Sequence, residues 1–142
     1  MKHLILTISL FTFFSCNSDS KSDSSSDADS KAKVVELDQK NPVSVVNHLF
    51  VAAKTGDYSQ LSGLCRPDGK GDGDTRRICE VANGDEKLKQ EYSKYFKNGK
   101  VDGDAKINGD RAAVPIKFGP NGNKDETMNL ALIDGKWYLS SF

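Results

Sequence analysis

The chain has 142 residues, and its 20 basic and 20 acidic side chains give a formal net charge of zero. These charges are interspersed after residue 35, and no stripe of Lys and Arg alternates with aromatic residues, which argues against a nucleic-acid partner. About 105 residues follow the N-terminal segment, which is the size of one small domain.

The N-terminal residues have the layout of a bacterial export signal. Lys2 supplies a basic start, and an apolar run from Leu4 to Phe14 leads to Ser15 and Cys16. A membrane-spanning helix needs about 20 apolar residues, and this run offers roughly 11 before polar residues follow. The segment is therefore predicted to direct export and not to span a membrane.

The four residues Phe13-Phe14-Ser15-Cys16 resemble the lipobox of bacterial lipoproteins, whose cysteine receives a diacylglyceryl group and becomes the mature N-terminus. Ser15 and Cys16 match the pattern. Phe13 stands where Leu is usual, and Phe14 stands where a small residue is usual. The resemblance implies a signal peptide over residues 1–15 and a membrane anchor at Cys16, because two or more acyl chains hold a protein stably. We expect the protein at the bacterial outer membrane, on either its periplasmic or its surface side. The alternative is secretion without lipid.

A tether is predicted to follow the lipidated cysteine. Residues 17–33 contain no large apolar side chain and are mostly Ser, Asp, Lys and Ala. Such a segment cannot bury enough surface to offset its ordering entropy. We therefore divide the chain into the signal peptide, a flexible tether over 16–38 with a reach of about 20 to 25 Å, and a domain over 39–142.

The domain is predicted to open with two helices. Asn41 and Pro42 are typical of an N-cap followed by proline at the first helical position. Apolar residues then recur at helical spacing until Gly56, where we expect the helix to end. Asp57 can cap a second, shorter helix that runs into Cys65.

Two more helical segments are predicted before residue 100. A turn or two of helix is expected over residues 78–82, with Asn83-Gly84 as its end. Asp85 can cap a longer helix that ends at Asn98-Gly99. One stripe of this helix carries Leu88, Tyr92, Tyr95 and Phe96, and its three aromatic residues are expected to belong to the core and not to a ligand platform.

From Lys100 onward the apolar period changes from 3.6 to 2, which predicts an antiparallel meander. A weak strand over 101–107 precedes the hairpin signal Asn108-Gly109, and Asp134-Gly135 marks the last tight turn. Pro115 cannot donate to a strand ladder, so we expect an edge or a bulge there. Helices followed by strands predict an α+β fold in which the helices cover one face of a curved antiparallel sheet.

Two segments resemble a family of small lipoprotein domains. NPVSVVNHLFVAAKTGDYSQLSGLC resembles the opening helices of domains with the nuclear transport factor 2-like (cystatin-like) fold, notably the domain of unknown function 4878 group. ETMNLALIDGKWYLSSF resembles their closing hairpin. The resemblance covers residues 42–142 and implies a cone of helices on a curved sheet, without an assigned activity.

The segment CRPDGKGDGDTRRIC, Cys65–Cys79, is the most conspicuous candidate for chemistry. An EF-hand register that starts at Asp68 or Asp72 places Lys70 or Arg76 where calcium needs an oxygen ligand. The phosphate-binding P-loop pattern fails too, because the glycines are wrongly spaced and no Ser or Thr follows the lysine. Neither calcium nor phosphate binding is therefore predicted for this segment.

The two cysteines of this segment are predicted to form a disulfide. Structural zinc needs about four Cys or His ligands, and the mature domain offers Cys65, Cys79 and His48. A redox dithiol usually shows two residues between its cysteines, whereas 13 separate these two. Export exposes the chain to oxidising conditions, and lipid attachment at Cys16 leaves an even pair. We therefore expect a Cys65–Cys79 disulfide and no metal.

No catalytic residue and no cofactor is predicted. His48 is the only histidine after the signal peptide, and on a helical wheel it lies off the buried stripe, so we expect it to be exposed. A Ser-His-Asp or Cys-His arrangement cannot be built from such a histidine. The arginines Arg66, Arg76 and Arg77 are interpreted as a solvated rim of the cysteine segment and not as an anion clamp.

Two functions are compatible with these features. The one we expect is a non-enzymatic, envelope-anchored domain that binds a small ligand or an envelope protein. The alternative is a small isomerase or hydrolase with a carboxylate and a tyrosine in a cleft, as in steroid isomerases of the nuclear transport factor 2-like fold. A buried carboxylate beside a tyrosine in an apolar pocket would favour the enzyme, and a pocket filled by side chains such as Trp137 would argue against it.

Overall fold

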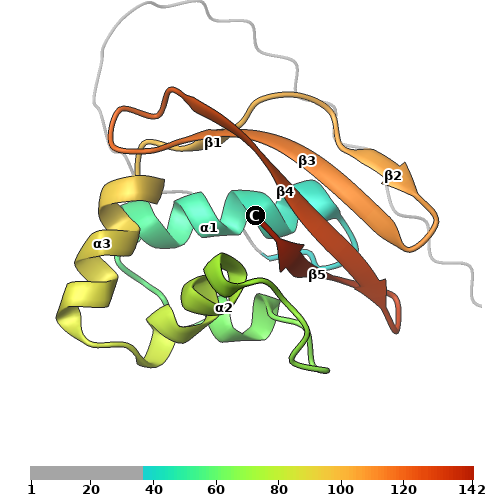
Figure 1. The fold of residues 1–142 in the computed structure, drawn as a ribbon, viewed down its shortest axis with the longest axis horizontal. Helices are drawn as coiled ribbons and strands as arrows, with labels where there is room; N and C mark the ends of the chain where they lie inside the picture. Colours follow the sequence, from blue (N-terminus) through green and yellow to red (C-terminus); the bar gives the residue numbers. More distant parts are fainter. Residues whose placement is uncertain (1–36) are drawn as a thin grey trace, which may run out of the picture. The chain divides into compact units, whose positions relative to one another are not determined.

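The computed structural model describes residues 37–142, which form an α+β domain of three α-helices and a five-stranded antiparallel sheet (Figure 1). The α+β class predicted from the sequence is confirmed. The predicted signal peptide, Cys16 and the predicted tether up to residue 36 lie outside the described residues. Within the described part, every helix is too short or too polar to span a membrane.

The first helix, α1 (Pro42–Thr55), begins and ends where the sequence predicts. The Asn41 side chain accepts a hydrogen bond from the amide of Val43 at 2.9 Å, which satisfies one of the free amides at the helix start. Gly56 ends the helix with φ at 75°, a left-handed conformation that glycine adopts without steric cost. Local chemistry alone is sufficient to place this helix.

The second predicted helix is only a short 3-10 turn, η1 (Leu61–Leu64). Asp57 does not cap it, because its carboxylate instead accepts from the amide and the hydroxyl of Ser59, at 3.1 and 2.7 Å. These bonds make a local turn, which is the usual competitor of a helix at Asp. The residues after Gly56 therefore form a turn before the 3-10 helix begins at Leu61.

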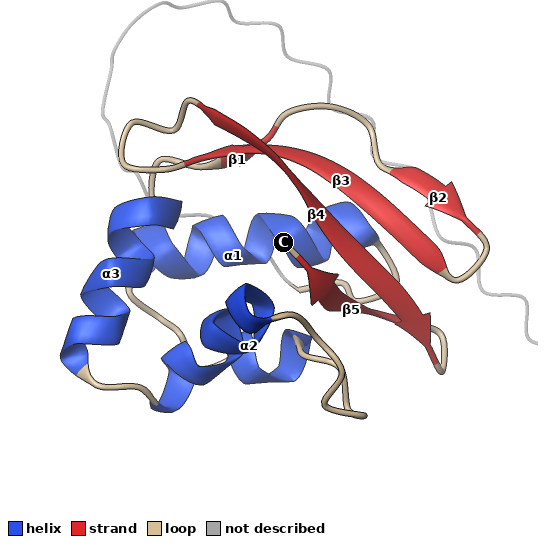
Figure 2. Ribbon diagram, viewed as in Figure 1, coloured by secondary structure: helices blue, strands red, loops and turns tan. Residues whose placement is uncertain are grey.

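Two further α-helices follow. Helix α2 (Gly73–Glu80) begins inside the cysteine segment, earlier than expected, and continues into the 3-10 turn η2 (Val81–Asn83). Helix α3 (Glu86–Phe96) begins as predicted, with the Asp85 carboxylate accepting from the Leu88 amide at 2.8 Å. In Figure 2 the helices gather on one side of the strands, and α1 runs across the sheet.

The sheet has the order β1-β3-β4-β5, and β2 also pairs with β3. All neighbours are antiparallel, as the meander predicts. The strands are β1 (Lys100–Val101), β2 (Lys106–Asn108), β3 (Arg111–Phe118), β4 (Lys124–Ile133) and β5 (Lys136–Ser141).

Pro115 lies in the central strand β3 and not in an edge strand. The interruption occurs in its neighbour: the predicted strand over 101–107 is divided into β1 and β2, and the gap between them lies opposite Pro115. The Asp102 amide donates to the Pro115 carbonyl at 2.9 Å. The amide and carbonyl of a strand residue face the same neighbour, so the position of the missing Pro115 amide faces this gap, where the regular ladder is already interrupted.

The core lies between α1 and the inner face of the sheet. On the helix, Val45, Val46 and Leu49 are completely buried, and on the sheet Trp137 is 5% exposed. The alternation predicted for the strands is therefore correct. The remaining inner-face residues of the sheet that are buried are Ala112, Val114, Ile116, Phe118, Met128, Leu130 and Leu139.

Candidate functional site

The predicted disulfide is present and joins Cys65 to Cys79, with their Cα atoms 6.0 Å apart. It connects the end of η1 to α2, so the segment between the cysteines forms a closed loop. Cys65 also makes an isolated parallel bridge with Leu139 of β5. The loop is thus attached to the sheet as well as to a helix.

Asp72 attaches the middle of this loop to the last strand. Its carboxylate accepts from the amide of Thr75 at 2.7 Å, which caps α2, and from the amide of Phe142 at 2.8 Å. Its own amide donates to the carbonyl of Ser140 at 3.3 Å. Burial alone would raise the pKa of Asp72, but the hydrogen bonds from Phe142 and Thr75 outweigh it and lower the pKa. Asp72 thus provides a specific link between α2 and the sheet.

The three arginines of the predicted rim differ in their surroundings. Arg66 is largely covered, with 20% of its side chain exposed, and it holds Asp68 through two bonds of 2.6 and 2.9 Å inside the loop. Arg76 and Arg77 are exposed, as predicted. Arg77 pairs with Glu91 of α3 at 2.6 Å, and this pair bridges the two helices.

His48 is buried, contrary to the prediction that it is exposed. Its side chain is 9% exposed, and Nδ1 has no hydrogen-bond partner among the described residues. Burial lowers the pKa of His48, an effect that the nearby Asp57 partly opposes. A helical wheel assumes one buried face, whereas α1 contacts η1 and α3 as well as the sheet and is buried on several sides.

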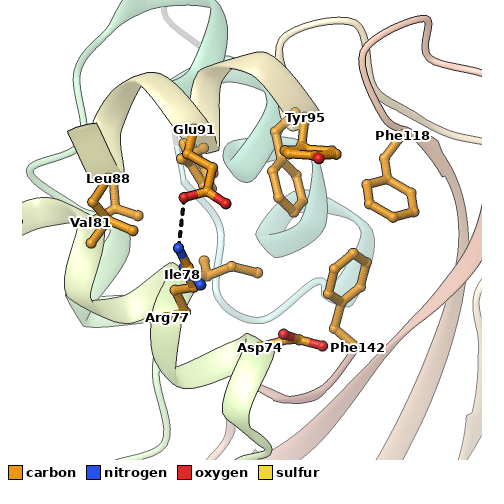
Figure 3. Close-up of a pocket in the computed structure, with 11 residues that line it drawn as sticks. Asp74, Arg77, Ile78, Val81, Leu88, Glu91, Tyr95, Phe118 and Phe142 are labelled. Carbon is orange, nitrogen blue, oxygen red and sulfur yellow. Dashed lines mark hydrogen bonds and ion pairs between the residues drawn. The ribbon is translucent and has the colours of Figure 1, made fainter. Parts of the chain in front are cut away.

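A cavity of about 160 Å³ lies between α2, α3 and the end of the sheet (Figure 3). Aromatic rings form much of its wall: the Phe142 ring centroid lies 5.7 Å from that of Phe96 and 4.9 Å from that of Phe118. The other residues that line it are Asp74, Arg77, Ile78, Val81, Leu88, Glu91, Tyr92 and Tyr95.

The two tyrosines of the predicted apolar stripe behave differently. Tyr92 is 4% exposed, and its hydroxyl donates to the Leu49 carbonyl at 2.8 Å. Burial raises the pKa of Tyr92 well above its ordinary value. Tyr95 is 39% exposed and borders the cavity. The prediction that the stripe belongs to the core is confirmed for Tyr92 and Phe96 and is wrong for Tyr95.

The carboxylates at the cavity are accessible to solvent: Asp74 is exposed, and the side chain of Glu91 is 43% exposed. Among residues 37–142 the buried polar side chains are His48 and Thr75, so the described part holds no buried carboxylate beside a tyrosine. Nor do three or more His, Cys, Asp or Glu side chains gather in this part in a way that would hold a metal ion. The cavity can take up an apolar group, and its mouth can contact charge.

The cavity is not predictable from the sequence alone. Ile78 was expected only as part of a short helix, and Phe118 and Phe142 were not singled out as partners of one another. The apolar spacing of residues 88–96 is the one local signal, since it leaves an aromatic ring at the edge of the buried stripe. The cavity itself depends on α2, α3, the end of β3 and Phe142, which meet only in the folded chain.

Comparisons with known proteins give one structural likeness. No protein-family model matches the sequence, and no curated protein matches it. Among solved structures, a Campylobacter jejuni protein described as an NTF2-like transpeptidase is 17% identical, with a TM-score of 0.46, and the likeness covers 72% of this chain and 98% of that one. We draw no conclusion about activity from a likeness of this degree.

Proposed function

We propose that the chain is a lipid-anchored, non-catalytic binding protein of the bacterial envelope, whose domain holds a ring-sized apolar group in the cavity between α2 and α3. The cavity is the observation that carries this proposal. Its 160 Å³ is close to the roughly 150 Å³ of an apolar cavity that binds benzene. It is well below the roughly 300 to 1,000 Å³ of sites for drug-sized ligands. One ring or one branched aliphatic group fits, and the rest of the ligand stays outside.

The walls of the cavity are held in place before a ligand arrives. The disulfide holds α2, and Asp72 holds both the start of α2 and the amide of Phe142. The hydroxyl of Tyr92 is bonded to the main chain of α1. A site built on such restrained elements loses little conformational entropy on binding, which favours affinity.

Lipid at Cys16 would place this domain at the membrane surface. The proposal rests on the lipobox-like residues before Cys16 and on the polar tether that follows. Mass spectrometry of the membrane fraction should find an acylated N-terminus at Cys16. An unmodified mature protein in the soluble fraction would contradict the anchor and would leave the cavity unaffected.

Uptake of a small aromatic probe tests the cavity. We expect toluene to shift the amide resonances of α2 and α3 in the full chain that carries Cys16→Ser, a change that prevents lipid attachment. Ile78→Phe fills the cavity from its wall and should abolish the shifts, because Ile78 is 4% exposed and lines it. The matched control is Ile107→Phe at an isoleucine of β2 that is 58% exposed. Shifts that persist in Ile78→Phe would refute the proposed site.

A further inference from the structure

The chain contains four Asn-Gly pairs, the dipeptide most prone to spontaneous deamidation. In this reaction the glycine nitrogen attacks Cγ of the asparagine and loses its proton, the side-chain amide leaves as ammonia, and a cyclic succinimide forms. Water then opens the succinimide to aspartate or to isoaspartate, in which the main chain runs through the side-chain carbonyl. Glycine favours the attack because it has no Cβ to obstruct it. The four pairs are Asn83-Gly84, Asn98-Gly99, Asn108-Gly109 and Asn121-Gly122.

The glycine amides of three pairs are engaged in hydrogen bonds. Each donates to the carbonyl three residues earlier, at 2.9 to 3.1 Å: Gly84 to Val81, Gly99 to Phe96 and Gly122 to Gly119. A methyl group placed on any of these glycines would overlap neighbouring atoms, so the main chain has little room to rotate there. The Asn98 side chain is held as well, because its amide donates to the Pro120 carbonyl at 2.6 Å. Attack at these three pairs first requires a bond to break.

The pair Asn108-Gly109, which the sequence marks as a hairpin turn, has neither restraint. Asn108 is the last residue of β2 and pairs with Arg111 of β3, so Gly109 and Asp110 lie beyond the end of the ladder. Within residues 37–142 the Gly109 amide donates no backbone hydrogen bond. Both Asn108 and Gly109 are exposed, and a methyl group on Gly109 would meet nothing within 4 Å.

The end of β2 can also open without disturbing the core. The attack requires rotation of the main chain at Asn108, which separates it from Arg111. Strand β2 has three residues, all exposed, and it lies beside β3 at the rim of the sheet (Figure 1). A segment without buried side chains opens at a low cost in free energy. The turn can therefore reach the reactive conformation while the rest of the sheet stays folded.

We propose that Asn108 is the site at which the folded domain deamidates first, and that the fold protects the other three Asn-Gly pairs. The product carries a new carboxylate next to Asp110 and opposite Arg111. Isoaspartate also adds an atom to the main chain, which disturbs the pairing of β2 with β3. This proposal is independent of the cavity and its ligand.

The chain contains a matched comparison for this test, because the tripeptide Asn-Gly-Asp occurs both at Asn83 and at Asn108. The full chain carrying Cys16→Ser is incubated in mildly alkaline buffer, and each pair is followed by peptide mapping with mass spectrometry. Asn108 should deamidate about two- to tenfold faster than Asn83, the factor that corresponds to the net strength of one hydrogen bond. In concentrated urea, where the fold is lost, Asn108 should no longer be faster.

The variant Asn108→Gln should remove the fast isoaspartate product, because the longer side chain would need a larger and less favoured ring. Equal rates at Asn83 and Asn108 in the folded chain, or a faster reaction at one of the other two pairs, would overturn the proposal. A preference for Asn108 that persists in urea would also overturn it, since its cause would then lie in the neighbouring residues and not in the fold.

Discussion

Replacement of Asp72 by alanine should destabilise the domain more than the loss of an ordinary helix cap. The change removes the cap on the Thr75 amide, which contributes about 1 kcal/mol. It also removes the bond from the Phe142 amide, and a hydrogen bond to a charged group contributes about 1.5 to 3 kcal/mol. Because Asp72 is only partly buried, we expect the lower part of that range and a total loss of about 2 to 3 kcal/mol in the free energy of unfolding.

Asp85→Ala is the matched control for this measurement. Asp85 caps α3 through the Leu88 amide at 2.8 Å, in the same geometry, but no second amide donates to it within the described residues. Urea unfolding at neutral pH should therefore show a loss of about 1 kcal/mol for Asp85→Ala, clearly below that for Asp72→Ala. Equal losses in the two variants would refute the argument that Asp72 links the disulfide loop to the end of the sheet.

Acid should remove the advantage of Asp72 over asparagine. The pKa of Asp72 is lowered in the folded state, so its ionised form stabilises the fold fully above the ordinary carboxyl range, near pH 4. This contribution is lost as the pH falls from there through the lowered pKa. We expect Asp72→Asn to be less stable than the parent chain at pH 7 and to approach it as the pH falls below the ordinary carboxyl range through the lowered pKa of Asp72. A difference that stays constant over this window would contradict the assigned charge state.

Three further perturbations test other parts of the fold. Replacing both Cys65 and Cys79 by serine should lower the free energy of unfolding by about 3 kcal/mol, and non-reducing peptide mapping of the parent chain should recover the two cysteines in one linked pair. His48 has a lowered pKa, so stability should be complete above about pH 6.5 and fall as the pH drops below it; His48→Leu should lose this step in urea unfolding, and its persistence would exclude His48 as the cause. Gly99→Ala should cost about 1 to 3 kcal/mol because the added methyl would overlap the Phe50 ring, whereas Gly63→Ala, with open space around it, should be tolerated.

The parts of the fold that the sequence predicted correctly are those with short-range causes. Asn41, Gly56 and Asp85 begin or end helices through bonds to residues a few positions away, and those bonds are encoded in the local residue order. The alternation of apolar residues in β3 and in the first part of β5 has the same character, because alternate residues there lie on the buried face of the sheet. The disulfide could be predicted from the expected oxidising compartment and from the even number of cysteines left after Cys16.

The errors arise where a distant segment decides the outcome. His48 is buried because η1 and α3 cover parts of α1 that a helical wheel treats as free. The strand over 101–107 is broken opposite Pro115. Which of its residues face Pro115 depends on the register between the strands, which the local sequence does not show. Asp72 could be read as one turn former among several, since nothing near it shows that the Phe142 amide would reach it.

Local residue order was thus sufficient for the class of the fold, most helix ends, the strand alternation and the pairing of two cysteines. It could not place the cavity, whose walls come from α2, α3, the end of β3 and Phe142. The physical reason is that capping and periodicity act over a few residues, whereas a cavity is space left between elements after they pack. Which side chains face that space, and which charges gather at its mouth, is decided only when the chain is folded.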